Sequence, residues 1–388
     1  MKSILLLLGL FAALPAAAQS PRWVLAWAAP AAAALAGDAT KALADGTANN
    51  QTLRILVTPD MVGVRMRLRL SNRFGARPLE LDDIWVAASA GGAAQVAHSA
   101  RAVMFKAARR ISIPAGSSLW TDAFAPPLGA RTLTISLRVV GLSPALAAGA
   151  GTGYATASGA HANEDGEAEF IDALSFSPIL EAMEIQPAVA VQSVAIIGDA
   201  PGATSGDGWP EILRRRLPEA SGEPVVVARL ATPGLTLAAL ARALDDDFLP
   251  PTLGGVLISA GQADITAPRP NPEAAADAFA ALARRLRALL PGAKLVATTL
   301  PPLARGGLAV DQDRARAALN QFVRLTDSVD QVADLDAAVA APDGALRSAF
   351  VGGPGGLPDR AGQLALAAAV PFASLLRGSA TAAMKAAP

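Results

Sequence analysis

Cysteine is absent from this chain of 388 residues, and histidine is almost absent. Without cysteine the protein can form no disulfide, thiolate nucleophile or cysteine metal site. The two histidines, His98 and His161, both lie in the N-terminal half of the chain. We therefore expect no metal and no cofactor. Any histidine-dependent catalysis in the C-terminal half would need a side chain from the other half.

An excess of charge of one sign is also missing, since Lys plus Arg number 33 and Asp plus Glu number 33. A nucleic-acid-binding protein usually shows a basic excess, so we expect no nucleic-acid partner. Hydrophobic residues make up 52% of the chain, which is ample for a core. The one long apolar run stands at the N-terminus. We therefore predict that the mature chain has no membrane span.

The N-terminus has the pattern of an export signal. Lys2 gives a positive start, Ile4 to Leu14 is apolar, and Ala16 to Ala18 offer small residues for cleavage before Gln19. The apolar run is shorter than the ~20 residues that cross a bilayer. A buried N-terminal helix is the alternative. We predict a signal peptide over residues 1–18, a periplasmic or extracellular location, and an irregular C-terminal tail over residues 379–388.

Residues 19–188 favour a β-sandwich or jelly roll. Residues 64–70 alternate apolar and basic residues, which is typical of a half-buried strand, and Arg65, Arg67 and Arg69 are interpreted as its solvated face. Further strand-like runs are residues 53–57, 84–87, 110–113 and 132–139. Turn sequences rich in Gly and Pro separate them. The domain boundary is expected near Gln186 and Pro187.

Residues 189–378 alternate apolar strands with helical segments. Five β-α pairs of this kind predict a parallel, three-layer α/β sheet of the flavodoxin-like type. The expected strands are residues 189–197, 225–230, 255–259, 295–300 and 332–335. The expected helices are residues 209–217, 235–249, 272–290, 311–325 and 360–376.

Several stretches in both regions resemble the SGNH/GDSL hydrolases, in the secreted branch where a β-domain precedes the catalytic domain. The stretches are residues 23–27, 53–54, 64–72, 113–116, 159–161, 209–211, 316–320 and 332–336. The resemblance keeps its order over nearly the whole chain after residue 18. It implies the SGNH version of the flavodoxin-like fold and a catalytic site built from four sequence blocks.

The first two blocks depart from the pattern. The family's Gly-Asp-Ser, whose serine is the nucleophile, corresponds to Gly198-Asp199-Ala200, and a methyl group cannot attack a carbonyl. Thr204 and Ser205 lie nearby and are poor substitutes, since they correspond to the loop before the next helix. The second block supplies a glycine N–H to the oxyanion hole, and here Ala231 stands at that position.

The other two blocks have lost their side-chain chemistry. Gly-x-Asn-Asp corresponds to residues 261–264, so Ala263 replaces the oxyanion-donating Asn, beside Gln262 and Asp264. Asp-x-x-His corresponds to residues 354–357, so Pro354 replaces the acid and Leu357 the base. A nucleophile needs a base, and the base needs an orienting acid. The resemblance therefore implies a degenerate member, a pseudoenzyme.

Three functions remain open. The first is a non-catalytic protein that binds a glycan, cell-wall or ester-bearing ligand in a cleft lined by Asp199, Gln262 and Asp264. The second is an active esterase with migrated groups, in which His161 or His98 serves Ser205 or Thr204. The third is a structural envelope protein with a filled cleft. Oligomeric state stays open.

Overall fold

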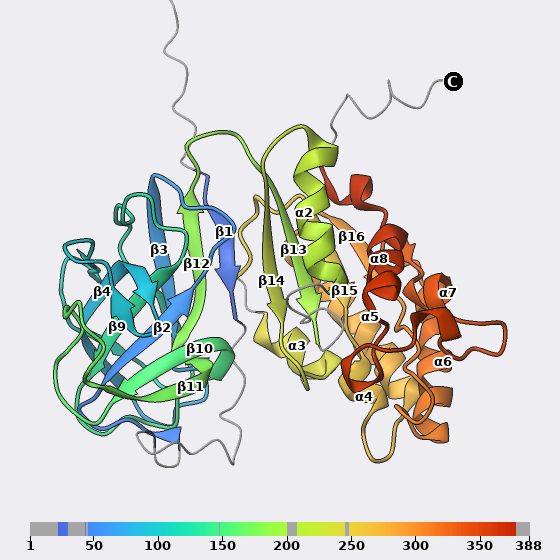
Figure 1. Ribbon diagram of the computed structural model, residues 1–388, viewed down its shortest axis with the longest axis horizontal. Coiled ribbons are helices and arrows are strands. Elements are labelled where there is room, and N and C mark those ends of the chain that lie inside the picture. Colours follow the sequence, from blue (N-terminus) through green and yellow to red (C-terminus); the bar gives the residue numbers. More distant parts are fainter. Residues whose placement is uncertain are drawn as a thin grey trace, which may run out of the picture.

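The computed structural model describes residues 22–29, 43, 46–146, 148–199, 208–244 and 248–377. The predicted signal peptide, the C-terminal tail and residues 200–207 lie outside this part. Figure 1 shows a strand-rich N-terminal region beside a region in which helices flank a sheet. The α/β fold class with a strand-rich N-terminal region, expected from the sequence, is confirmed.

The N-terminal region consists of two antiparallel sheets. One has the order β1-β12-β3-β8, and the larger has the order β11-β10-β2-β9-β4-β5, with β6 and β7 also on β4. Its strands are β1 (Val24–Ala28), β2 (Thr52–Val57), β3 (Arg65–Ser71), β4 (Leu79–Gly91), β5 (Ala94–Gln95), β6 (Arg101–Ala102), β7 (Ile111–Ile113), β8 (Ser118–Trp120), β9 (Leu133–Val139), β10 (Ala148–Thr156), β11 (Phe170–Pro178) and β12 (Leu180–Gln186). Buried aliphatic side chains such as Leu53, Ile55, Leu68 and Ile135 share one core cluster.

The basic face of β3 is solvated only at Arg65, so the interpretation as a solvated face was wrong for Arg67 and Arg69. The side chain of Arg69 is 1% exposed and forms an ion pair with Glu181, 3.0 Å away on β12. Arg67 pairs with Glu184, and its guanidinium lies 4.5 Å from the ring centroids of both Trp23 and Trp120. The alternating pattern correctly predicted a strand with one polar face. It could not reveal that a neighbouring strand supplies acidic partners to that face.

The C-terminal region is built around a five-stranded parallel sheet with the order β14-β13-β15-β16-β17. This is the flavodoxin-like strand order, 2-1-3-4-5. The strands are β13 (Gln192–Gly198), β14 (Val225–Ala231), β15 (Gly255–Ser259), β16 (Lys294–Thr298) and β17 (Gln331–Ala333). All four neighbouring pairs are parallel, so every strand ends at the same edge of the sheet.

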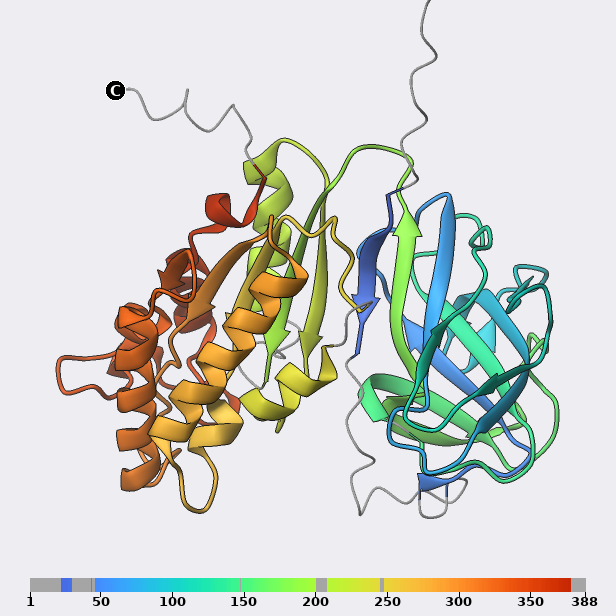
Figure 2. The ribbon, with the colours of Figure 1, turned by 180° about the vertical axis from the view of Figure 1, so that it is seen from behind.

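Helices cover both faces of this sheet (Figures 1 and 2). The helices are α2 (Trp209–Ser221), α3 (Leu237–Ala243), α4 (Gln262–Ile265), α5 (Pro272–Leu289), α6 (Val310–Leu325), α7 (Leu335–Val339) and α8 (Arg360–Ala369). The core beneath α2, α7 and α8 is separate from the core beneath α3, α5 and α6. No helix in the described ranges combines the length and apolar character needed to cross a bilayer.

Local sequence explains where the longest helix begins. The side chain of Asn271 accepts a hydrogen bond from the N–H of Ala274, and Pro272 occupies the first helical turn of α5. The expected helix over residues 235–249 is shorter in the structure, where α3 ends at Ala243. Leu244, Phe248 and Leu249 are still buried, because they pack into the core as loop residues.

The two regions meet along a continuous interface. Strand β1 of the N-terminal region lies against β14, the edge strand of the parallel sheet. The carboxylate of Asp60 accepts the free N–H of Val227 on β14 at 2.7 Å, which satisfies an edge-strand donor. The Arg69 guanidinium also lies 5.3 Å from the ring centroid of Phe248. Leu25 belongs to the same buried cluster as the second region's core, so the interface is partly apolar.

Candidate functional site

The carboxyl ends of β13, β14 and β15 lie at one level, where the sequence predicted the site. Gly198 pairs with Ala231 on one side and with Ser259 on the other. A Cβ atom on Gly198 would lie only 1.8 Å from the Ser259 carbonyl oxygen, so only glycine permits this approach. The parallel topology thus brings the first two blocks of the resemblance together.

Asp199 is buried directly after β13 and holds the third block in place. Its Oδ2 atom accepts a hydrogen bond from the N–H of Ala263 at 2.7 Å, at the start of α4. The pKa of Asp199 is raised to about 7, chiefly by burial and also by the nearby charge of Asp264, while backbone hydrogen bonds oppose the change. The second oxygen, Oδ1, has no hydrogen-bond partner among the described residues.

Asp264 performs a similar structural task. Its Oδ2 atom accepts a hydrogen bond from the N–H of Leu237 at 3.0 Å, which links α4 to the first turn of α3. Burial raises the pKa of this carboxyl as well. Gln262 begins α4, and its main-chain carbonyl accepts hydrogen bonds from Thr266. Both carboxylates therefore accept hydrogen bonds from main-chain N–H groups at this edge.

The fourth block forms the loop before α8. The short 3-10 turn η3 (Pro354–Gly356) is followed by Leu357, which is half-buried. The carbonyl of Gly356 accepts a hydrogen bond from the N–H of Ala304, in the loop after β16, at 2.7 Å. The side chain of Asp359 caps α8 by accepting the N–H of Gly362 at 2.9 Å. This loop thus lies beside the carboxyl end of the sheet.

The described residues include only part of the predicted site. Asp199, Ala231, Ala263 and Asp264 converge through the contacts above. Ala200, Thr204 and Ser205 lie outside the described residues. The predicted convergence of Ala200 with Pro354 and Leu357 therefore stays a prediction.

His161 lies in the N-terminal region, in the loop between β10 and β11. Its Nδ1 atom lies 3.0 Å from the carboxylate of Glu164, and its Nε2 atom lies 3.1 Å from the Ser158 carbonyl oxygen. The side chain is 21% exposed. Both ring nitrogens are thus engaged within the β-domain. His98 is exposed and occupies a turn with a φ of 60°.

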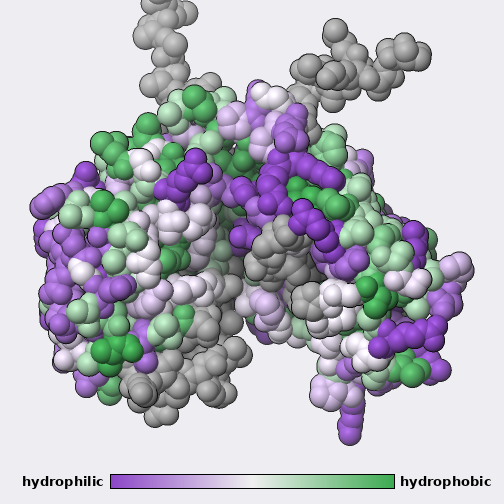
Figure 3. Space-filling model, viewed as in Figure 1, coloured by the Kyte–Doolittle hydropathy of each residue, from purple (hydrophilic) through white to green (hydrophobic). Residues whose placement is uncertain are grey.

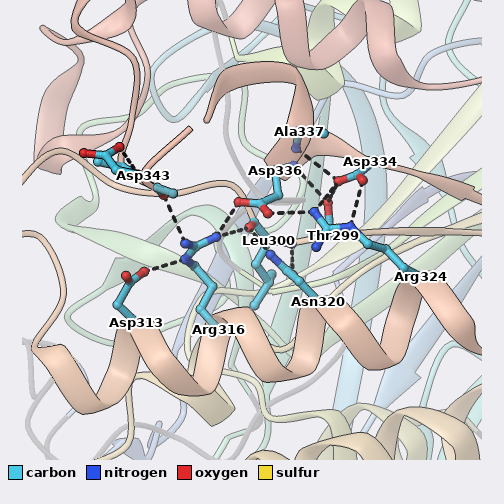
Figure 4. Close-up of polar contacts among 12 residues, drawn as sticks. Thr299, Leu300, Asp313, Arg316, Asn320, Arg324, Asp334, Asp336, Ala337 and Asp343 are labelled. Atoms are coloured by element: carbon cyan, nitrogen blue, oxygen red, sulfur yellow. Dashed lines mark hydrogen bonds and ion pairs between the residues drawn. The ribbon is translucent and has the colours of Figure 1, made fainter. Parts of the chain in front are cut away.

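A charge network secures the other half of the sheet edge (Figure 4). Arg316 of α6, whose side chain is 3% exposed, pairs with Asp313 and with Asp336 of α7 and donates to the Leu300 carbonyl. Asn320 bonds both the N–H and the C=O of Leu300. The sequence resemblance included these positions without giving them a role. Their role is to fasten the loop after β16, which in turn contacts Gly356.

The outer part of the same network joins α6 to the end of β17. Arg324 donates two hydrogen bonds to Asp334 and one to Asp336, and these contacts raise the pKa of Arg324. Asp334 also caps α7 by accepting the N–H of Ala337 at 3.1 Å. Within the described ranges, no three His, Asp or Glu side chains are grouped so as to hold a metal ion.

Comparison with known proteins identifies the parallel-sheet region. Residues 196–363 match the GDSL-like Lipase/Acylhydrolase family. No curated protein matches the chain.

Several solved structures are similar to the chain at low identity. The lipase Lip_vut3 from a goat rumen metagenome is 14% identical, with a TM-score of 0.40, covering 48% of this chain and 99% of that one. An active-site mutant of a family two carbohydrate esterase from Clostridium thermocellum is 13% identical, with a TM-score of 0.36, covering 89% of this chain and 90% of that one. A carbohydrate esterase family 3 protein from Talaromyces cellulolyticus is 14% identical, with a TM-score of 0.37, covering 46% and 93%.

The matched residues run from β13 to α8 and include the strand ends that carry Asp199, Ala231 and Ala263. The flavodoxin-like strand order agrees with this match. The parallel-sheet region of this chain is therefore a GDSL/SGNH lipase-acylhydrolase domain.

Proposed function

We propose that this protein is an exported, non-hydrolytic member of the GDSL/SGNH superfamily that binds a glycan or ester-bearing ligand. One observation carries the proposal. At the carboxyl edge of the sheet, Asp199 and Asp264 accept backbone N–H groups, while Ala231 and Ala263 occupy the neighbouring positions. The polar side chains described at this edge are therefore hydrogen-bond acceptors for the main chain. They do not form a pair of nucleophile and base.

The chemistry of ester hydrolysis explains why this matters. A serine hydroxyl is a poor nucleophile unless a base within hydrogen-bond reach takes its proton. In the alignment proposed here, Ala200, Leu357 and Pro354 replace the nucleophile, the base and the orienting acid. In a serine protease the loss of the nucleophile alone costs ~10⁶ in rate. No residue after position 161 is a histidine, so this domain has none of its own to act as the base.

The retained architecture supports binding in place of a purely structural role. An open parallel sheet leaves a crevice beyond its carboxyl edge, where ligands of such folds bind. Around this edge the buried Arg316 and Asn320 still hold the loop after β16. Such an arrangement preserves the shape of the edge after its reactive groups are gone.

The test is an assay of the purified protein on 4-nitrophenyl acetate and on acetylated xylo-oligosaccharides. We expect the wild type and an Ala200→Gly variant to show the same rate as buffer. Turnover by the wild type that disappears in Ser205→Ala or His161→Ala would overturn the proposal. It would instead establish the alternative, an esterase with migrated catalytic groups.

The position of His161 weighs against that alternative. Its ring is engaged by Ser158 and by Glu164 in its own loop. To serve Ser205 the ring would have to leave both partners. The binding proposal requires no such rearrangement.

A further inference from the structure

A groove of about 830 Å³ runs between the two domains, separate from the predicted catalytic positions. Its walls are the loop between β2 and β3, the loop between β8 and β9, and the first turns of α2 with β14. In Figure 3 this face is hollowed between the domains, and hydrophilic side chains gather on the α2 side. The volume lies within the ~300–1,000 Å³ of small-molecule sites.

The two acidic side chains of the groove share one arginine partner. Arg214 donates two hydrogen bonds to Glu211, at 2.8 and 2.6 Å, and lies 3.3 Å from Asp60. The hydrogen bond from Arg214 holds the pKa of Glu211 below its usual value. Asp60 also accepts the N–H of Val227. One arginine thus fixes both carboxylates at the groove wall.

Two further arginines line the groove. Arg229 on β14 and Arg131 in the loop before β9 are both exposed, and no ion pair or hydrogen bond joins either of them to a described residue. The charge of Arg229 nevertheless favours the ionised forms of Asp60 and Glu211. The lining therefore holds three arginines against two carboxylates, a surplus of one positive charge. A guanidinium with free donors binds a carboxylate in a bidentate manner.

Most of the remaining lining is apolar. Pro126, Pro127 and Leu128 form one wall, and Leu128 is 91% exposed. Met61 and Val62 contribute from the other loop of the β-domain. An oligosaccharide presents both C–H faces, which suit such a wall, and hydroxyl donors, which suit the spare lone pairs of Asp60 and Glu211.

We infer that this groove binds an acidic oligosaccharide whose uronate carboxylate pairs with Arg229 and Arg131. The inference rests on the proposed function, because it assumes that the chain binds a glycan without hydrolysing it. It adds the location, the charge of the ligand and the residues that recognise it. None of the predicted catalytic positions lines this groove.

The experiment is isothermal titration calorimetry of the full chain with trigalacturonate, with the neutral trisaccharide cellotriose, and with citrate as a carboxylate without sugar rings. We expect trigalacturonate to bind most tightly and to weaken as salt rises, because the contact is between exposed charges. Arg229→Gln should weaken it roughly tenfold or more, since a charge-assisted hydrogen-bond pair is lost.

The matched control is Arg284→Gln, because Arg284 is also an exposed arginine and lies on α5, at the other face of the sheet. This variant should bind trigalacturonate as the wild type does. Equal weakening by both variants, equal affinity for citrate or cellotriose, or no binding of trigalacturonate would each overturn the inference. Hydrolysis of an ester substrate would contradict the proposed function alone, so the two failures are distinguishable.

Discussion

The carboxyl edge of the parallel sheet has two halves that differ sharply in chemistry. At the ends of β13, β14 and β15, the positions next to Asp199 and Asp264 are alanines. At the ends of β16 and β17, Arg316, Asn320 and Arg324 form a dense network with acidic and main-chain partners (Figure 4). The two halves belong to one sheet, and yet ion pairs between described side chains are found only at the second, whereas the acids of the first accept main-chain N–H groups.

This difference separates the requirements of the scaffold from those of the reaction. A buried arginine must keep its partners, because breaking a buried ion pair leaves an uncompensated charge. A nucleophile or a base contributes nothing to folding, so alanine or leucine can replace it without structural cost. The same reasoning explains why Asp199 remains when its neighbour is Ala200. Its carboxylate holds α4.

The largest effect should come from rebuilding the altered half. A variant with Ala200→Ser, Ala263→Asn, Pro354→Asp and Leu357→His would contain a nucleophile, an oxyanion donor, an orienting acid and a base. General base catalysis alone is worth ~10²–10⁴ in rate. We expect esterase activity on 4-nitrophenyl acetate at least ~10³-fold above Ala200→Ser alone.

The matched control for this rebuilding is Ala200→Ser, which should be as inactive as the wild type because no base serves the hydroxyl. Circular dichroism of the fourfold variant separates misfolding from misalignment. A folded but inactive variant would show that the fourth block is not residues 354–357. The positive φ angles of Gly355 and Gly356 make this loop the most demanding part.

The next effect concerns the network on the opposite half. Arg316→Met removes the charge from a side chain that is only 3% exposed, and of the two ion pairs of the partly buried Asp336 only the one with Arg324 remains. We expect a loss of about 3–5 kcal/mol in the free energy of unfolding, measured by urea denaturation. The control is Arg314→Met on the exposed face of α6, which should change it by less than about 0.5 kcal/mol.

Asp199 should make stability depend on pH. Its pKa is about 7 in the folded protein, above the ordinary value of 3.8, so the native state binds the proton more tightly than the unfolded state. Stability is therefore lost as pH rises from about 4 to about 7. Asp199→Asn removes the ionisation. The wild type should lose about 3 kcal/mol relative to this variant between pH 5 and pH 8.

Urea denaturation of both proteins across this pH range measures the effect. Asp311→Asn, at an exposed position on α6, serves as the control and should track the wild type at every pH. A constant difference between wild type and Asp199→Asn would mean that the buried carboxyl keeps its ordinary pKa.

The smallest expected loss of stability comes from a substitution on the solvent-exposed side of the arginine–aspartate network. The Arg324 side chain is 36% exposed, although it contacts both Asp334 and Asp336. Exposed ion pairs contribute roughly 0–1 kcal/mol and are screened by salt. Arg324→Ala should therefore cost under about 1 kcal/mol, with a smaller cost in 1 M sodium chloride. A loss as large as that of Arg316→Met would contradict the ranking by burial.

The sequence by itself determined the fold class, because strand and helix periods are local properties. The apolar runs that became β14 and β15 and the helical pattern of α5 predicted a parallel sheet with crossover helices. Parallel strands end at one edge, so the proximity of Asp199 and Ala263 also followed from the order of elements. The loss of a reactive side chain can be recognised directly in the sequence. The alanines at the predicted catalytic positions were therefore identified without the structure.

Only the tertiary structure decided which partners the charged residues meet. Alternation marked Arg67 and Arg69 as one face of a strand, but their acidic partners lie on β12, more than a hundred residues away. Asp60 and Arg214 likewise meet only because the strand-rich region packs against the parallel-sheet region. The raised pKa of Asp199 depends on burial, which is a property of the packed core. Local pattern sets the period of a segment, whereas long-range packing sets its neighbours and the free energy of each charge.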